Sequence, residues 1–265
     1  MPYFERSDCK IYYEICGSGS PLVLLHGLGA DNASWLTVRD LLAKKHTLIM
    51  PDNCLSGRSS CMNIAAVNIH TLAQDVKALL EYLGIKKAVI CGHSMGGMVA
   101  MEFVLNFPEM TEKLILECTT AVSSKRNNEL FSAWSDYINK EGYTEIMWRL
   151  MFAWMRSPSF YQNNPGNTES TIQFILKYPY MPKPANFERM TQLLSEYNCT
   201  DRLKNISVPC LVISGDEDIL IAPDENRAIA AAIKNSRFVL LKNTGHNAHF
   251  ESPDIFTSEI LAFVS

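Results

Sequence analysis

The sequence predicts an α/β fold built on a mostly parallel sheet with a helical insertion. Short apolar runs alternate with segments of helical periodicity in the first and last parts of the chain, as in repeated β-α-β units. Between residues 121 and 206 the strand pattern disappears, and large apolar side chains recur at helical spacing. We therefore expect a core domain of residues 1–120 and 207–265. Residues 121–206 are expected to form a cap over the carboxyl ends of the strands, where such sheets bind ligands.

The first part of the chain supplies the beginning of the predicted sheet. Residues 10–16 alternate between apolar and polar and are expected to pair with residues 3–7 through a turn at residues 7–9. Residues 22–25 form a continuous apolar run, which is typical of a parallel strand buried on both faces.

The predicted helices follow from apolar faces and from helix-breaking residues. The helix expected at 71–83 has one apolar face and ends at Gly84, because glycine readily adopts the left-handed conformation of a helix C-cap. Five prolines between residues 158 and 184 divide the insertion into several short helices. The remaining predicted elements are helices at 34–43, 95–106 and 223–233 and from 253 onward, and strands at 47–50, 88–91, 114–116, 210–214 and 238–241.

Composition and charge exclude several classes of protein. The chain has 265 residues, of which 47% are hydrophobic and 20% charged, so it is expected to fold as a globular protein. A net charge of -4 without a basic stripe argues against nucleic acid as a partner. No apolar run approaches the roughly 20 residues that span a bilayer, and the N-terminus lacks a signal-peptide pattern. We expect a soluble, cytoplasmic protein, either monomer or homodimer.

The cysteines predict neither disulfides nor a metal site. They are scattered without a Cys-x-x-Cys pair, and no cysteine and histidine have the spacing of zinc ligands. Reduced thiols are therefore expected, with no metal and no cofactor. The cysteines are Cys9, Cys16, Cys54, Cys61, Cys91, Cys118, Cys199 and Cys210.

The clearest chemical motif is Gly92-His93-Ser94-Met95-Gly96, which fits the pattern Gly-x-Ser-x-Gly. It lies between a predicted strand and a predicted helix, where a sharp turn exposes the serine as a nucleophile. The residues two before and two after the serine must be small in such a turn, and both are glycine here. The start of the helix also directs free N–H groups toward the reacting oxygen. Ser94 is therefore the predicted nucleophile.

With this turn in this order of strands and helices, the chain resembles the α/β-hydrolase superfamily over nearly its whole length. The resemblance implies a central sheet of about eight strands and an oxyanion hole made by two backbone N–H groups. These map to Met95, directly after the nucleophile, and to Leu28 in the segment His26-Gly27-Leu28-Gly29. His26 is expected to hold this loop in place rather than to act as a base.

The family order of serine, acid and histidine places the base late in the chain. Gly245-His246, followed by Glu251-Ser252-Pro253, matches the family pattern Gly-His-x4-Glu-x-Pro, so His246 is the expected base. His249 falls within the x4 segment and is expected to lie beside the base or to line the pocket.

Three carboxylates compete for the role of the acid, because Asp216, Glu217 and Asp218 all follow the strand predicted at 210–214. The family spacing Gly-x-x-Asp, with Pro223 a few residues later, favours Asp218. Asp216 is the alternative. The acid orients the imidazole and stabilises its cation without accepting the proton.

The resemblance implies hydrolysis through an acyl-enzyme on Ser94. In size and in its insertion the chain is similar to small serine carboxylesterases and lactonases, including 3-oxoadipate enol-lactonases and pimeloyl-carrier-protein methyl ester esterases. The expected substrate is a small-molecule ester, lactone or thioester, either free or carrier-bound. Carbon–carbon bond hydrolysis or acyl transfer on the same residues is the alternative, and a non-catalytic ligand receptor is a third hypothesis. A serine rather than an aspartate at the turn argues against haloalkane dehalogenases and epoxide hydrolases.

One loop departs from the family pattern. Many relatives have Asp-x-Arg-Gly-x-Gly-x-Ser after the strand predicted here at 47–50. This chain has Asp52-Asn53-Cys54-Leu55-Ser56-Gly57-Arg58-Ser59, without the arginine and the first glycine. The shape of this loop, and the subfamily assignment that would rest on it, stay open.

The insertion is rich in aromatic residues and methionine, which either line an apolar pocket or fix the cap to the core. The sequence has no cluster of arginines that would predict a carboxylate-binding site, so it does not support an acidic substrate. The side chains predicted to contact the substrate are Trp35, Trp134, Trp148 and Trp154.

Overall fold

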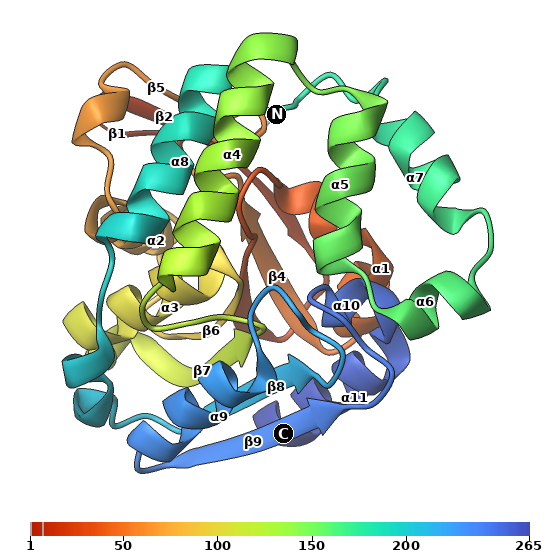
Figure 1. Ribbon diagram of the computed structural model, residues 1–265. Helices are drawn as coiled ribbons and strands as arrows, with labels where there is room; N and C mark the ends of the chain where they lie inside the picture. The colour runs from red at the N-terminus through yellow and green to blue at the C-terminus, as the bar shows by residue number, and fades with distance from the viewer. Residues whose placement is uncertain (1, 7) are drawn as a thin grey trace.

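A nine-stranded sheet forms the centre of the molecule in the computed structural model, which describes residues 2–6 and 8–265 (Figure 1). The strands are β1 (Tyr3–Arg6), β2 (Cys9–Cys16), β3 (Ser20–Leu25), β4 (His46–Pro51), β5 (Ser60–Cys61), β6 (Ala88–His93), β7 (Thr111–Glu117), β8 (Cys210–Gly215) and β9 (Ser236–Leu241). They lie in the order β1-β2-β4-β3-β6-β7-β8-β9, and β5 pairs with β2. The pairs made by β2 are antiparallel and all the others are parallel, so the sheet is mostly parallel, as predicted.

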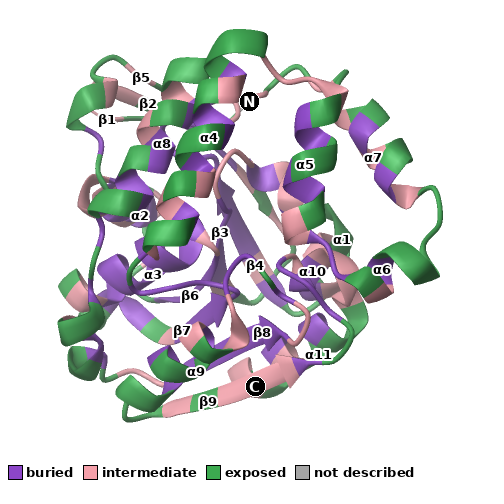
Figure 2. Ribbon diagram, viewed as in Figure 1, coloured by how far each residue is buried: buried purple, intermediate pink, exposed green. Residues whose placement is uncertain are grey.

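Helices cover both faces of this sheet (Figure 1). One face carries α2 (Ile69–Tyr82), α3 (Met95–Asn106) and α9 (Pro223–Ala232), and the other carries α1 (Leu36–Leu42), α10 (Ala248–Glu251) and α11 (Pro253–Val264). Successive side chains of β3 alternate between the two layers: Val23 and Leu25 contact the first group, and Leu22 and Leu24 the second. All four are fully buried, which explains the continuous apolar run (Figure 2).

The structure differs from the prediction at several element boundaries and contains short elements that were not predicted. α2 begins at Ile69, earlier than predicted, because Asn68 accepts a hydrogen bond from the N–H of Thr71 at 2.9 Å and the Thr71 hydroxyl accepts one from the N–H of Asn68 at 2.8 Å. The helix predicted at 34–43 is divided into a 3₁₀ turn, η1 (Asn32–Trp35), and α1. The turns η2 (Ile64–Ala66), η3 (Pro108–Met110) and η4 (Thr200–Asn205), with β5 and α10, were not predicted.

The N-terminal hairpin forms as predicted, with β1 antiparallel to β2. Cys9, which the sequence places in the turn, is instead the first residue of β2 and pairs with Arg6. Ser7, the first residue of the predicted turn, lies outside the described residues.

The segment between β7 and β8 is helical, as its composition predicts. Its helices are α4 (Lys125–Glu141), α5 (Glu145–Met155), α6 (Pro158–Asn163), α7 (Asn167–Ile175) and α8 (Pro184–Glu196). Pro158 and Pro184 begin α6 and α8 because proline suits the first turn of a helix, where its missing N–H is not needed. α4 packs beside α8 and α5 beside α7 (Figure 1).

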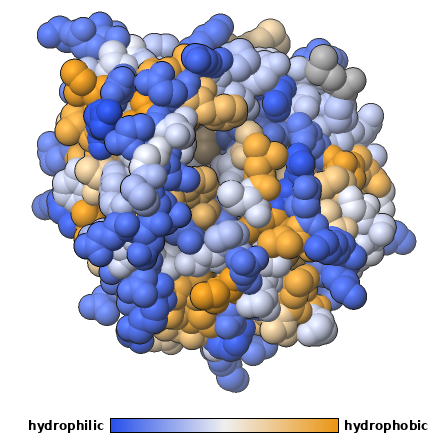
Figure 3. Space-filling view, turned by 90° about the vertical axis from the view of Figure 1, so that its right-hand side faces the viewer, coloured by the Kyte–Doolittle hydropathy of each residue, from blue (hydrophilic) through white to orange (hydrophobic). Residues whose placement is uncertain are grey.

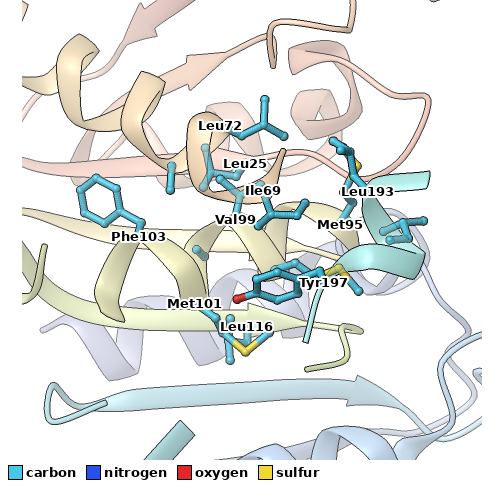
Figure 4. Close-up of a cluster of buried hydrophobic side chains, with 14 of the residues drawn as sticks. Leu25, Ile69, Leu72, Met95, Val99, Met101, Phe103, Leu116, Leu193 and Tyr197 are labelled. Carbon is cyan, nitrogen blue, oxygen red and sulfur yellow. The ribbon is translucent and has the colours of Figure 1, made fainter. Parts of the chain in front are cut away.

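The hydrophobic core continues from the sheet into this helical segment. One cluster of buried side chains joins β3, β6 and β7 to α2 and α3 and extends into α4, α5 and α8. Figure 4 shows part of it, with Leu25 and Phe103 from the sheet and α3 and with Leu193 and Tyr197 from the end of α8. The division of the chain into a core domain and a cap at residues 121–206 therefore stays a prediction. None of the described helices has the length and apolar character needed to cross a bilayer.

Phe103 provides a test of this core. Its ring is fully buried on α3, so we expect Phe103→Ala to lower the free energy of unfolding by about 3–5 kcal/mol through lost burial and a residual cavity. Ile146→Ala, at a side chain that is 63% exposed on α5, should change it by less than about 0.5 kcal/mol. Urea denaturation measures both. A loss below about 1 kcal/mol for Phe103→Ala would show that α3 is not packed as described.

Candidate active site

Ser94 occupies a strained turn between β6 and α3. Its φ of 54° and ψ of -120° lie in a region of backbone conformation that residues other than glycine rarely adopt. A Cβ on Gly92 would lie 2.2 Å from the carbonyl oxygen of Gly96, and a Cβ on Gly96 would lie 2.1 Å from that of Leu25. Only glycine fits at both positions, as the motif predicts.

The turn is fixed by neighbouring backbone. The N–H of Ser94 donates to the carbonyl of Glu117 at the end of β7, at 2.9 Å. The hydroxyl of Thr119 donates to the carbonyl of Ser94 at 2.7 Å. These bonds hold the serine at the carboxyl ends of the parallel strands, where its side chain is half-buried.

A continuous chain of hydrogen bonds joins Ser94, His246 and Asp218. Nε2 of His246 lies 3.0 Å from Oγ of Ser94, and Nδ1 lies 2.9 Å from Oδ2 of Asp218. The other carboxylate oxygen accepts from the N–H groups of Leu220 and Ile221, both at 2.9 Å. The side chains of His246 and Asp218 are 2% and 0% exposed, so the imidazole is held between the serine and a desolvated carboxylate.

The other two carboxylates after β8 point elsewhere. Asp216 forms an ion pair with Lys242 at 3.3 Å and accepts from the N–H of Thr244. Glu217 accepts from the hydroxyl and the N–H of Ser159 at the start of α6. Of the three candidates, the structure brings only Asp218 to His246.

The loop after β3 contains Leu28, and its shape is set by the buried side chain of His26. Nδ1 of His26 donates to the carbonyl of Gly27 at 2.9 Å, and Nε2 accepts from the N–H of Asn53 at 3.0 Å. Burial lowers the pKa of His26, in keeping with this neutral tautomer. Met95 is the first residue of α3, and an N–H at that position has no acceptor within its own helix.

Asp52 connects this loop to the one that departs from the family pattern. Its carboxylate accepts from the N–H of Asn32 at 2.9 Å and from that of Arg58 at 2.8 Å. Burial nevertheless outweighs these bonds and raises the pKa of Asp52 to about 7.

A second histidine–carboxylate pair lies beside that of His246 and Asp218. Nδ1 of His249 is 2.7 Å from a carboxylate oxygen of Glu117, which also accepts from the N–H of His249 at 2.8 Å. His93 bridges the two pairs: its Nε2 donates to the carbonyl of His246 at 3.0 Å, and its ring lies 4.8 Å from that of His249. Burial, with the two neighbouring histidines, holds the pKa of His93 well below its ordinary value, so this ring is neutral.

Glu117 is the residue of this site that the sequence did not reveal. It ends the apolar run of β7, and a carboxylate at the carboxyl end of a central strand is the signal that could have identified it. Its side chain is fully buried.

A cavity opens above Ser94 and His246. A small chamber of about 70 Å³ contacts both side chains, and a larger one of about 490 Å³ extends beneath α5 and α7. Figure 3 views the α5 and α7 side of the molecule, where the surface is hollowed between hydrophobic residues. The two chambers share Leu28, Ala30, Ser34, Met151, Met155, Asn247 and His249.

The four tryptophans predicted to contact substrate differ in position. Trp134 lines the small chamber and Trp148 the large one. Trp35 is fully buried with its ring 4.7 Å from that of His249, and Trp154 lies 5.5 Å from the guanidinium of Arg126. Neither Trp35 nor Trp154 lines either chamber, so the structure brings only two of the four to the cavity.

The fold and this site define an α/β hydrolase, and comparison with known proteins agrees. Residues 22–259 match the alpha/beta hydrolase family, and the chain belongs to it. A putative carbamate hydrolase, RutD, from Azorhizobium caulinodans is 26% identical, over 99% of this chain and 98% of its own. A pimeloyl-[acyl-carrier protein] methyl ester esterase from Nitrosospira multiformis is also 26% identical, over 96% of this chain and 98% of its own.

Solved structures show the same fold. A thermophilic esterase from Thermogutta terrifontis superposes with a TM-score of 0.86 at 28% identity, covering 97% of this chain and 93% of that one. The enol-lactonase from Burkholderia xenovorans superposes with a TM-score of 0.88 at 23% identity and covers 99% of both chains.

The raised pKa of Asp52 makes stability depend on pH. A carboxyl that binds its proton more tightly when folded than when unfolded contributes stability that falls as the pH rises from about 4 to about 7. We expect the unfolding free energy of the wild type, relative to Asp52→Asn, to fall by about 1 kcal/mol per pH unit over that range. Denaturant titrations at several pH values measure this slope. Parallel pH profiles for the two proteins would contradict it.

Proposed function

We propose that the protein is a serine hydrolase that cleaves a carboxylic ester, lactone or thioester through an acyl-enzyme. The observation that carries this proposal is the unbroken chain of hydrogen bonds from Asp218 through His246 to Ser94 at the base of an apolar cavity. Ser94 is the proposed nucleophile, His246 the base and Asp218 the residue that orients it.

In the first half of the reaction, Oγ of Ser94 attacks the carbonyl carbon while its proton passes to Nε2 of His246. The carbonyl oxygen becomes an oxyanion that accepts hydrogen bonds from the N–H groups of Leu28 and Met95. Asp218 stabilises the imidazolium, and its two N–H bonds from the backbone keep the carboxylate oriented. The carbon–oxygen or carbon–sulfur bond then breaks, and the leaving group takes the proton from His246.

In the second half, His246 takes a proton from water, and the hydroxide attacks the acyl carbon. The intermediate collapses with Ser94 as the leaving group, so an acid is released and the serine hydroxyl is restored. The strained backbone of Ser94 supports this mechanism. The packing that enforces the turn also fixes the position of Oγ, so the nucleophile needs no rearrangement before it attacks.

The cavity supports a substrate with an apolar group. The large chamber is lined mainly by aromatic, aliphatic and methionine side chains, among them Trp148, Phe152 and Ile175. About 490 Å³ is the size of a small-molecule site, and the proposed substrate places its acyl or alcohol group there.

A carbamate is the second candidate substrate. The putative carbamate hydrolase that is 26% identical over 99% of this chain favours it, and attack on a carbamate carbonyl would use the same groups. Carbon–carbon bond hydrolysis, acyl transfer and a receptor without catalysis are distinguished from ester hydrolysis by the experiment below.

Ser94→Ala tests the nucleophile. We expect the wild type to hydrolyse p-nitrophenyl esters from acetate to octanoate and to be labelled by a fluorophosphonate, and the variant to lose labelling and at least about 10³-fold in turnover. Ser170→Ala, at an exposed serine on the rim of the large chamber, is the matched control and should keep both activities.

The other outcomes separate the alternatives. Labelling at Ser94 without ester turnover would favour carbamate hydrolysis, carbon–carbon bond hydrolysis or acyl transfer over ester hydrolysis. Substrates for those reactions would then be assayed. If the wild type shows no labelling and no turnover, the result favours a receptor without catalysis.

The acid has its own test. We expect Asp218→Asn to lower kcat by about 10³- to 10⁴-fold, because an amide no longer favours the imidazole tautomer that accepts the serine proton. Asp216→Asn removes a carboxylate that is paired with Lys242 instead and should change kcat by less than about threefold. Equal losses in steady-state assays of the two variants would refute the assignment.

A further inference from the structure

Three cysteines from separate parts of the chain meet at the antiparallel edge of the sheet. Cys9 begins β2, Cys61 ends β5, and the two are directly opposed in the β2–β5 pair. Their sulfur atoms lie 2.9 Å apart, and the sulfur of Cys54, from the loop between β4 and β5, lies within 4.8 Å of both. This cluster includes none of the proposed catalytic residues.

A carboxylate lies beside two of the three sulfurs. Oδ1 of Asp8 lies 3.7 Å from the sulfur of Cys9, and Oδ2 lies 3.8 Å from that of Cys61. The three sulfurs and this carboxylate border a cavity of about 100 Å³, which Asp75 and Arg6 also line. Asp75 lies next to the thiol of Cys54, but its carboxylate is held in an ion pair with Arg6, whereas Asp8 contacts the sulfurs of Cys9 and Cys61.

This donor set fits a soft divalent cation. Zinc bound by thiolates at about 2.3 Å and by a carboxylate oxygen at about 2.0 Å in a tetrahedron requires sulfurs about 3.8 Å apart and oxygen about 3.5 Å from each sulfur. The Cys9–Cys61 sulfur separation, and the distance from each of these sulfurs to one oxygen of Asp8, come within about 1 Å of these values. Side-chain rotation has to bring a single oxygen of Asp8 and the sulfur of Cys54 into the same tetrahedron. Cys9, Cys61 and Asp8 are half-buried, which leaves a path for the ion, whereas Cys54 is buried.

We propose that Cys9, Cys54, Cys61 and Asp8 form a structural binding site for one Zn²⁺-class cation. A disulfide between Cys9 and Cys61 would use two of the sulfurs and leave the third sulfur and the carboxylate without a role. A cation uses all four groups and joins β2, β5 and the loop between β4 and β5.

The site also accounts for the departure of this loop from the family pattern. Cys54 stands at the position where the pattern Asp-x-Arg-Gly-x-Gly-x-Ser has its arginine. A side chain that would bring a positive charge is thus replaced by a thiol directed at two other thiols.

Cobalt titration of the full-length, reduced protein tests the proposal, because Co²⁺ bound by thiolates gives an intense charge-transfer absorption. We expect one Co²⁺ per chain in the wild type, displaced by Zn²⁺, with the absorption lost in Cys9→Ser and in Cys61→Ser. Asp8→Asn should weaken binding by at least about tenfold. Cys16→Ser, a half-buried cysteine at the other end of β2, is the matched control and should bind as the wild type does.

A second measurement covers any variant that folds poorly. Zinc should raise the melting temperature of the wild type and of Cys16→Ser but not that of Cys61→Ser. Circular dichroism first establishes that Cys61→Ser is folded. Cys54→Ser carries a buried substitution and is used only where its fold is intact.

Three results would overturn the proposal. One is reduced wild-type protein that binds no Co²⁺. Another is absorption that persists in both Cys9→Ser and Cys61→Ser, which would place the metal at other residues. The third is a Cys9–Cys61 disulfide, found by mass spectrometry after removal of reductant, in a protein that binds no metal when reduced.

Discussion

The close approach of backbone around Ser94 is the constraint on which the rest of the site depends. The positive φ of this residue costs of the order of 1–3 kcal/mol, and the turn persists only because buried neighbours leave no other arrangement. Gly96 lies against the carbonyl of Leu25 in β3, and the N–H of Ser94 is bonded to Glu117 in β7. Three adjacent parallel strands therefore determine where Ser94 lies, and their buried apolar side chains supply the rigidity.

The proposed base, His246, is held from several directions. Its backbone N–H donates to the carbonyl of Met155 at the end of α5, at 2.8 Å, and its carbonyl accepts from neutral His93. The neighbouring pair of Glu117 and His249 fixes the turn that follows His246. Met155 also lines both chambers. A displacement of this end of α5 would therefore change the cavity and move His246 at the same time.

Sequence patterns made the fold class predictable and named three residues that the structure brings together, whereas contacts between distant segments were not predictable. The Gly-x-Ser-x-Gly turn and the parallel strands follow from residues close in sequence. The choice of Asp218 over Asp216 rested on the spacing of the family that the chain resembles, and the structure brings Asp218 to His246. The three-cysteine cluster escaped prediction because its members are up to 52 residues apart along the chain, and no short spacing marks them. Trp35 was expected at the cavity because it follows the oxyanion loop, and Trp154 because it lies in the helical insertion. Position in the chain does not show which surface a side chain faces, and neither residue lines the cavity.

The loop that departs from the family pattern links the proposed cation site to the oxyanion loop. Within three consecutive residues, Asp52 accepts from the N–H of Asn32, Asn53 donates to His26, and Cys54 reaches the thiol cluster. His26 in turn bonds the carbonyl of Gly27, directly before Leu28. The contacts of Asp52, Asn53 and His26 are short, buried hydrogen bonds, and Cys54 directly follows Asn53 in the chain, so a change in the position of Cys54 is transmitted to the backbone that carries the Leu28 N–H. A cation bound at the sheet edge would therefore limit the range of positions available to one of the two proposed oxyanion donors, without touching the substrate.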